Sequence, residues 1–138
     1  MVARRRFEVI LLAAFLAGAI LLWNTGGAEA RTFGTSSSFG FYSGTPGSDY
    51  PSSFHGQISS PSSQCRKARQ VKVFRKQRRR DVLVGKARAS STGQWTIEVN
   101  RRVPLAKYFA SVPRKKFGPR GRNVCRGYKS SALTFGQS

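Results

Sequence analysis

Residues 94–100 read Gln94-Trp95-Thr96-Ile97-Glu98-Val99-Asn100 and alternate between polar and apolar side chains without a break. Successive side chains of a β-strand point to opposite faces, so the alternation places Trp95, Ile97 and Val99 together on one face. The stretch therefore predicts a strand with one face in a hydrophobic core and one face in solvent.

Other segments around this strand have the same character. Val71 and Val73 flank Lys72, and Tyr108, Ala110 and Val112 recur at every second position. Gly- and Pro-containing breaks separate these segments, and no stretch after residue 53 sustains a helical period. The chain is therefore predicted to be all-β, a small antiparallel β-sandwich of six or seven strands. Six strands are expected at 54–58, around 71–73, and at 82–89, 94–100, 107–113 and 129–135.

The first 30 residues have the three parts of a secretory signal peptide. Three arginines at positions 4–6 precede an uncharged, mostly apolar run over residues 9–23, and Ala28-Glu29-Ala30 supplies a small-x-small site. Cleavage is expected after Ala30, with Ala28 and Ala30 as the two small residues. An uncleaved membrane anchor is the alternative, although a spanning helix normally needs about 20 apolar residues. The protein is expected to be secreted or extracellular, and membrane-anchored only if the signal is not cleaved.

Residues 31–52 are rich in Gly, Ser, Thr and Pro, with single aromatic residues between them. No sustained hydrophobic period appears, which favours a flexible Gly/Ser-rich linker. The alternative is a segment whose spaced aromatic side chains make weak multivalent contacts. The expected organisation is a signal peptide (1–30), a linker (31–52) and a disulfide-stapled sandwich domain (53–138).

Cys65 and Cys125 are the two cysteines of the chain. An even pair in an exported protein is expected to be oxidised, so the sequence predicts a disulfide between them. A bond closing a loop of about 60 residues stabilises the folded state by roughly 4 kcal/mol in the chain-entropy model. No metal or cofactor is expected, because metal sites need about three or four clustered ligands and the CxxC motif of redox sites is absent.

The chain carries 25 Lys and Arg residues against five Asp and Glu, a formal net charge of +20. Removing residues 1–30 leaves 22 bases and three acids, or +19. Solubility of a small domain asks for a net charge of only about 2–8, so this excess predicts affinity for an anionic partner. The basic clusters include Arg66, Lys67 and Arg69 before the second strand. The candidate polyanion-binding residues are Arg75, Lys76, Arg78, Arg79, Arg80, Arg114, Lys115, Lys116, Arg120 and Arg122.

Charge clusters of this kind bind phosphate or sulfate polymers without reading bases or sugars. The expected partner is therefore a cell-wall polymer, phospholipid headgroups or extracellular nucleic acid. Stacking of bases on Phe74, Phe109 and Phe117 would favour single-stranded nucleic acid, whereas core packing is the ordinary role of such residues. The alternative function is a purely structural or protein-binding extracellular sandwich in which the charge is incidental.

Catalysis is not expected, because the segment after residue 30 has only one histidine, His55, and three acids, Asp49, Asp81 and Glu98. A triad built on His55 would have to recruit Asp49 from the linker or Asp81 from a basic turn. Glycosidase chemistry would need Asp81 beside Glu98, which is expected to face solvent. A basic ribonuclease normally needs two acid-base groups near neutral pH.

Residues 53–135 resemble the carboxypeptidase regulatory-like, transthyretin-like β-sandwich domains of secreted proteins. Phe54-x-Gly56-x-Ile58 is similar to their opening strand, and Gln70–Phe74 to their second. The turn and strand at Ser91–Trp95 and the Tyr108 strand follow in the same order. The acidic residue usual in that turn is absent, and Leu105-Ala106-Lys107 replaces the customary Pro-Gly before the tyrosine. The resemblance implies a β-sandwich with a non-catalytic folding, spacing or adhesion role.

Overall fold

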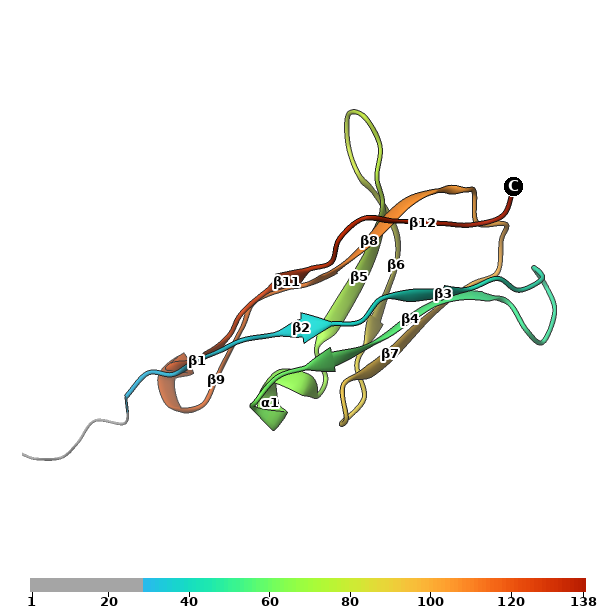
Figure 1. Ribbon diagram of the computed structural model, residues 1–138. Coiled ribbons are helices and arrows are strands. Elements are labelled where there is room, and N and C mark those ends of the chain that lie inside the picture. Colours follow the sequence, from blue (N-terminus) through green and yellow to red (C-terminus); the bar gives the residue numbers. More distant parts are fainter. Residues whose placement is uncertain (1–28) are drawn as a thin grey trace, which may run out of the picture.

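The computed structural model describes residues 29–138 (Figure 1). The expected signal peptide lies outside the described residues except for Glu29 and Ala30, which are exposed. No helix within residues 29–138 is long and apolar enough to cross a bilayer.

The described chain is all-β, as predicted, and forms a small antiparallel sandwich with a third, smaller sheet at one end. Its strands are β1 (Thr32–Phe33), β2 (Ser36–Ser37), β3 (Gly40–Tyr42), β4 (Ser52–Ser59), β5 (Gln70–Arg75), β6 (Val82–Arg88), β7 (Gln94–Val99), β8 (Ala106–Val112), β9 (Lys115–Phe117), β10 (Asn123–Cys125), β11 (Tyr128–Lys129) and β12 (Leu133–Phe135). A one-turn helix, α1 (Ser63–Arg66), precedes β5, and a 3-10 turn, η1 (Pro119–Gly121), separates β9 from β10.

The first sheet is built on the long strand β4, which pairs antiparallel with β7 on one side. On the other side β2 and β3 follow one another along β4. Gly56 of β4 lies opposite Trp95 of β7, and a Cβ at position 56 would lie 2.1 Å from the backbone oxygen of Ser38 and 2.7 Å from the Trp95 ring. Only glycine therefore lets β4, the indole and the N-terminal segment approach this closely.

The second sheet has β8 and β5 at its centre and β6 at one edge, while β11 and β12 both pair with β8 on the other side. The register between β5 and β6 shifts between Val73 and Phe74. Such a bulge, together with the charged residues Lys86 and Arg88 on β6, is a common protection of an edge strand against pairing with other chains.

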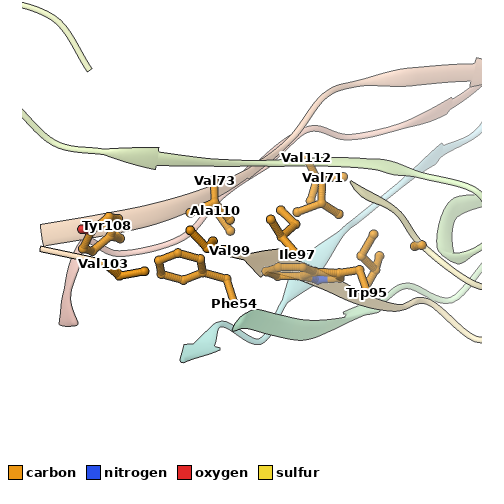
Figure 2. Close-up of a cluster of buried hydrophobic side chains, with 12 residues drawn as sticks. Phe54, Val71, Val73, Trp95, Ile97, Val99, Val103, Tyr108, Ala110 and Val112 are labelled. Carbon is orange, nitrogen blue, oxygen red and sulfur yellow. The ribbon is translucent and has the colours of Figure 1, made fainter. Parts of the chain in front are cut away.

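The core lies between these two sheets, and Figure 2 shows side chains from both layers meeting there. Trp95, Ile97 and Val99 of β7 are all buried, as their alternation predicted. Val71 and Val73 of β5 and Tyr108, Ala110 and Val112 of β8 are buried as well, which confirms the predicted core. Fully burying a valine or isoleucine side chain stabilises the fold by roughly 1.5–3 kcal/mol.

The prediction of a flexible linker over residues 31–52 is wrong for residues 32–42, which contain strands β1, β2 and β3. β2 and β3 belong to the first sheet, and Phe39 packs against Phe54, Trp95 and Phe135, with ring centroids 5.8, 6.2 and 5.2 Å away. The individual strands have only two or three residues, so no hydrophobic period could develop in the sequence. Pairing with β4 supplies the order that local propensity does not.

The final part of the chain also differs from expectation. The single strand predicted over residues 129–135 is divided into β11 and β12, because Ser130-Ser131-Ala132 interrupts the pairing with β8. The segment between the expected strands 107–113 and 129–135 contains the β9–β10 hairpin, which was not predicted, and β1 pairs in parallel with β10.

The disulfide between Cys65 and Cys125 is present, as predicted. It links α1 to β10, and both cysteines are fully buried. The Cα atoms of the two cysteines lie 5.4 Å apart and their sequence separation is 60, so the bond links the small third sheet to the sandwich.

Candidate functional site

Positive charge is divided unequally between the two main sheets. Strands β2, β3, β4 and β7 contain no lysine or arginine, and Glu98 of β7 is their one acidic residue. The strands of the second sheet contain no acidic residue. They carry six bases: Lys72, Arg75, Lys86, Arg88, Lys107 and Lys129. The sandwich therefore has one nearly neutral layer and one strongly cationic layer.

The outer face of the second sheet combines lysines with an aromatic pair. Lys72 lies opposite Lys86 on β6 and opposite Ser111 on β8, and Ser111 in turn pairs with Lys129 on β11. Near this row, Phe74 and Phe109 stack with ring centroids 5.4 Å apart. Lys129 Nζ lies 4.2 Å from the Phe109 centroid, a cation–π contact. The face is cationic because lysines occupy positions that alternate with core residues along the strands.

The connections at one end of the sandwich, here called the Arg78 end, form the first basic group. This end comprises loops 43–51, 76–81 and 100–105, and the 76–81 loop projects at the top of Figure 1. Lys76 N donates to Lys107 O at 2.8 Å, which fixes the base of that loop on β8. Arg78, Arg79 and Arg80 are exposed on it.

Two arginines of the Arg78 end, Arg75 and Arg101, affect the pKa of the buried Tyr108. Burial raises the pKa of Tyr108, and the nearby guanidinium groups of Arg75 and Arg101 offset part of this rise. The tyrosine hydroxyl itself donates to Pro104 O at 2.6 Å. Arg75 is half-buried, so it is less available to a polymer than the exposed Arg78.

The opposite end, here called the Cys65 end, comprises α1, the turn between β6 and β7, and the β9–β10 hairpin. It holds the second basic group: Arg114, Lys115, Lys116, Arg120 and Arg122. Arg120 has a positive φ of 56° in the turn of the hairpin, next to Gly121. Lys115 is half-buried and its Nζ donates to Gln64 O at 3.4 Å.

The ten residues predicted to bind a polyanion are thus not brought together in one site. They fall into two groups of five, separated by the seven-residue strand β8, a distance of about 20 Å at 3.3 Å per residue. The sequence prediction omitted the five strand bases Lys72, Lys86, Arg88, Lys107 and Lys129. Two of them could have been predicted from the sequence, because Lys72 and Lys107 occupy the outward positions of alternating strands. These five residues connect the two groups across one face.

Arg69 does not contribute to the basic surface expected around residues 66–69. Its side chain is only 2% exposed. The guanidinium donates to Cys65 O at 2.9 Å, Pro113 O at 2.6 Å, Arg126 O at 3.2 Å and Thr35 Oγ1 at 3.4 Å. Burial lowers the pKa of this group. Arg69 therefore acts as a buried tie between the N-terminal segment, α1 and both ends of the β9–β10 hairpin.

The acid-base residues are dispersed over the surface. His55 and Glu98 lie on the outer face of the first sheet, while Asp49 and Asp81 lie in separate loops of the Arg78 end. Backbone N of Gln77 donates to Asp81 Oδ1 at 3.4 Å. Between residues 29 and 138 no three His, Cys, Asp or Glu side chains cluster as metal ligands. A hollow of about 590 Å³ at the Cys65 end is lined by serines, Gln57, Thr92 and Arg66, without a histidine or carboxylate.

The three phenylalanines considered as stacking platforms have other partners. Phe109 is buried beneath Phe74 and Lys129, and Phe117 packs against Phe33 with centroids 5.8 Å apart. Phe74 is half-buried, so little aromatic surface is open to a nucleic-acid base.

Comparisons with known proteins found no match to this chain. No protein-family model matches the chain, and no curated protein or solved structure does so either. The Cys65–Cys125 disulfide is compatible with an extracellular location.

Proposed function

We propose that this protein is a non-enzymatic, exported module that contacts anionic polymers or surfaces through its basic loops. The observation that carries the proposal is the segregation of charge, with six bases and no acid on the second sheet and no base on the strands of the first. Solubility alone gives no reason for cations to gather on one layer. A positive electrostatic potential concentrates anionic partners at that surface.

Binding would arise from many weak interactions. Arginine and lysine at both ends and along the connecting face can each displace a counterion from a phosphate or sulfate group, which makes affinity fall with salt. The sandwich supplies a rigid support, in line with the resemblance to transthyretin-like domains. We propose export by cleavage after Ala30, and the intact mass of the mature protein should correspond to a chain starting at Arg31.

The experiment is salt-dependent binding to duplex DNA, used as a generic polyanion, and retention on a heparin support. Two matched triple variants remove the same charge at opposite ends: Arg78, Arg79 and Arg80 to Gln, and Arg114, Lys115 and Lys116 to Gln. Each should flatten the slope of log affinity against log salt by about 0.9 for every phosphate that the variant no longer neutralises.

Elution of the unmodified domain near physiological salt, about 0.15 M, would overturn the proposal, because exposed charges are then screened beyond about 8 Å. A purely structural or protein-binding role would take its place.

A further inference from the structure

The Arg78 end differs from the Cys65 end in the apolar surface that it exposes. Within residues 29–138 the large hydrophobic side chains that stand open to solvent are those of Tyr42, Tyr50, Val82, Leu83, Leu105 and Leu133. All of them belong to loops or strand ends at the Arg78 end. Val82 lies opposite Arg75 in the second sheet, Arg75 opposite Tyr108, and Tyr108 opposite Leu133, while Leu105 directly precedes β8.

The aliphatic members of this set are exposed well beyond what core packing requires. Leu105 is 59% exposed, Leu83 47%, Leu133 42% and Val82 39%. Single exposed leucines are common on protein surfaces, but the exposed large hydrophobic residues among residues 29–138 all share this end, which makes it the candidate binding surface.

Basic residues share the Arg78 end with these aliphatic residues. The Arg78 end has eight bases and two acids, Asp49 and Asp81, in its loops and at the adjoining strand ends. Its bases are Arg75, Lys76, Arg78, Arg79, Arg80, Arg101, Arg102 and Lys107. Arg102 donates to Ser138 O, which holds the C-terminus at this end as well. The partner must therefore offer negative charge and an apolar interior side by side.

From this juxtaposition we infer that the Arg78 end docks onto a bilayer surface containing anionic phospholipid. Leu83, Leu105 and their aliphatic neighbours enter the headgroup region, and the arginines of the 76–81 loop contact phosphates. Aliphatic side chains gain free energy by leaving water for the acyl boundary, and bases near an anionic bilayer add attraction. Tyr42 and Tyr50 suit the same boundary, where amphipathic rings are enriched.

A nucleic acid fits this end less well. Sequence-independent binding of single strands relies on exposed aromatic faces, and aliphatic side chains do not stack with bases. Phe109, an aromatic ring of the cationic sheet, is already covered by Lys129. The combination of charge and aliphatic surface thus favours a lipid surface over a base-bearing polymer.

This inference rests on the proposed function, and its test separates the two. Residues 31–138 contain every described strand, the core and the disulfide, so this chain is the one to use. Leu105→Trp adds an environment-sensitive indole at the Arg78 end, and Ser91→Trp adds one in the exposed turn at the Cys65 end. The native Trp95 is buried and gives a constant background.

Vesicles of pure phosphatidylcholine are compared with vesicles of equal parts phosphatidylcholine and phosphatidylglycerol. The indole of Leu105→Trp should shift to shorter wavelength and be quenched by brominated acyl chains on the anionic vesicles only, while that of Ser91→Trp stays in water. Neutralising Arg78, Arg79 and Arg80 should weaken vesicle binding roughly 100-fold. The matched triple at residues 114–116 should weaken it only a few-fold, because that end faces away from the bilayer.

A Leu83→Ser, Leu105→Ser double variant should lose vesicle affinity roughly tenfold or more, given the apolar area removed, yet elute from heparin like the unmodified domain. Both leucines are exposed, and circular dichroism checks that the variant folds. If the variant binds vesicles normally, or the indole at position 105 stays in water, the lipid inference is wrong and a soluble polyanion is the partner. If neither vesicles nor heparin retain the domain, the proposed function itself fails.

Discussion

The indole Nε1 of Trp95 donates a 3.0 Å hydrogen bond to Oγ of Ser37, a residue 58 positions earlier in the chain. Both side chains are buried. A buried N–H left without an acceptor costs free energy, so Ser37 completes the environment of the largest residue in the core. The N-terminal segment is therefore a structural part of the sandwich.

Replacing Ser37 by Val should lower the free energy of unfolding by about 1–3 kcal/mol, since the indole N–H would lose its acceptor inside the core. Urea denaturation of the purified domain measures this. Ser36→Val is the matched control on the same strand, where the side chain is exposed, and should stay within about 0.5 kcal/mol of the original. Equal midpoints for the two variants would contradict the role given to Ser37.

Starting the chain at Gly44 removes β1 to β3 and the rings of Phe39 and Phe41, which pack against the core. Unfolding should become easier by at least about 3 kcal/mol, comparable to the loss of one core phenylalanine. Thermal unfolding followed by circular dichroism tests this, because a true linker would leave the melting temperature unchanged.

Arg69→Lys should destabilise the protein strongly, by about 3 kcal/mol or more. A single ammonium cannot reproduce the planar fork that reaches four acceptors, and some of the buried carbonyls would lose their donor. Arg66→Lys offers the comparison, because Arg66 Nη1 makes one bond, to Ser60 O at 2.7 Å, and lysine can supply that. Denaturant titrations that give the two variants the same free energy of unfolding would contradict the structural role assigned to Arg69.

Replacing both Cys65 and Cys125 by Ser should cost roughly 2–5 kcal/mol, because an open chain regains the conformational freedom that the closed loop had lost. Intact mass should also rise by about 2 Da when the original protein is reduced. Stability that is independent of reductant would show that the bond does not form in solution.

Burial raises the pKa of Tyr108 above its ordinary value of 10.0. The folded state then keeps the phenol proton at pH values where the unfolded chain releases it. The unfolding free energy should be unaffected by this group below pH 10 and should fall as the pH rises from there to the raised folded value.

The Tyr108→Phe variant should lose this dependence on pH and, through loss of the bond to Pro104, about 1 kcal/mol at neutral pH. Tyr50→Phe is the control for removing a phenol hydroxyl, since Tyr50 is 73% exposed and its loss should change the stability at neutral pH by no more than about 0.5 kcal/mol. Parallel slopes for the original protein and Tyr108→Phe would exclude the effect. The comparison cancels the opposite contribution of Arg69, whose pKa burial lowers in both proteins.

Local pattern was sufficient wherever one strand had enough residues to show a period. The alternation around Trp95 and the pairs at 71–73 and 108–112 identified the buried face of β7, β5 and β8, because the core selects every second side chain. The cysteine pairing also followed from the sequence, since a two-cysteine chain has a single intramolecular solution.

The candidate binding surface could be predicted only in part from the sequence. The two basic loop groups are runs of like charge and stand out in any sequence, but their separation to opposite ends follows from the antiparallel order of β5 and β8. The lysines of the connecting face, such as Lys72 and Lys129, are spread over the sequence and become neighbours only through register.

The sequence by itself determined the strand character, the inward-facing residues and the excess of positive charge, because these depend on the order of neighbouring side chains. Tertiary structure alone decided that residues 32–42 contain strands, that Arg69 is buried, and that exposed leucines lie at the same end of the sandwich as Arg78, Arg79 and Arg80. Each of these rests on partners tens of residues away, such as Ser37 with Trp95 or Arg69 with Pro113. Long-range pairing supplies free energy that no local propensity contains, so a Gly- and Ser-rich segment became ordered once β4 offered it an edge.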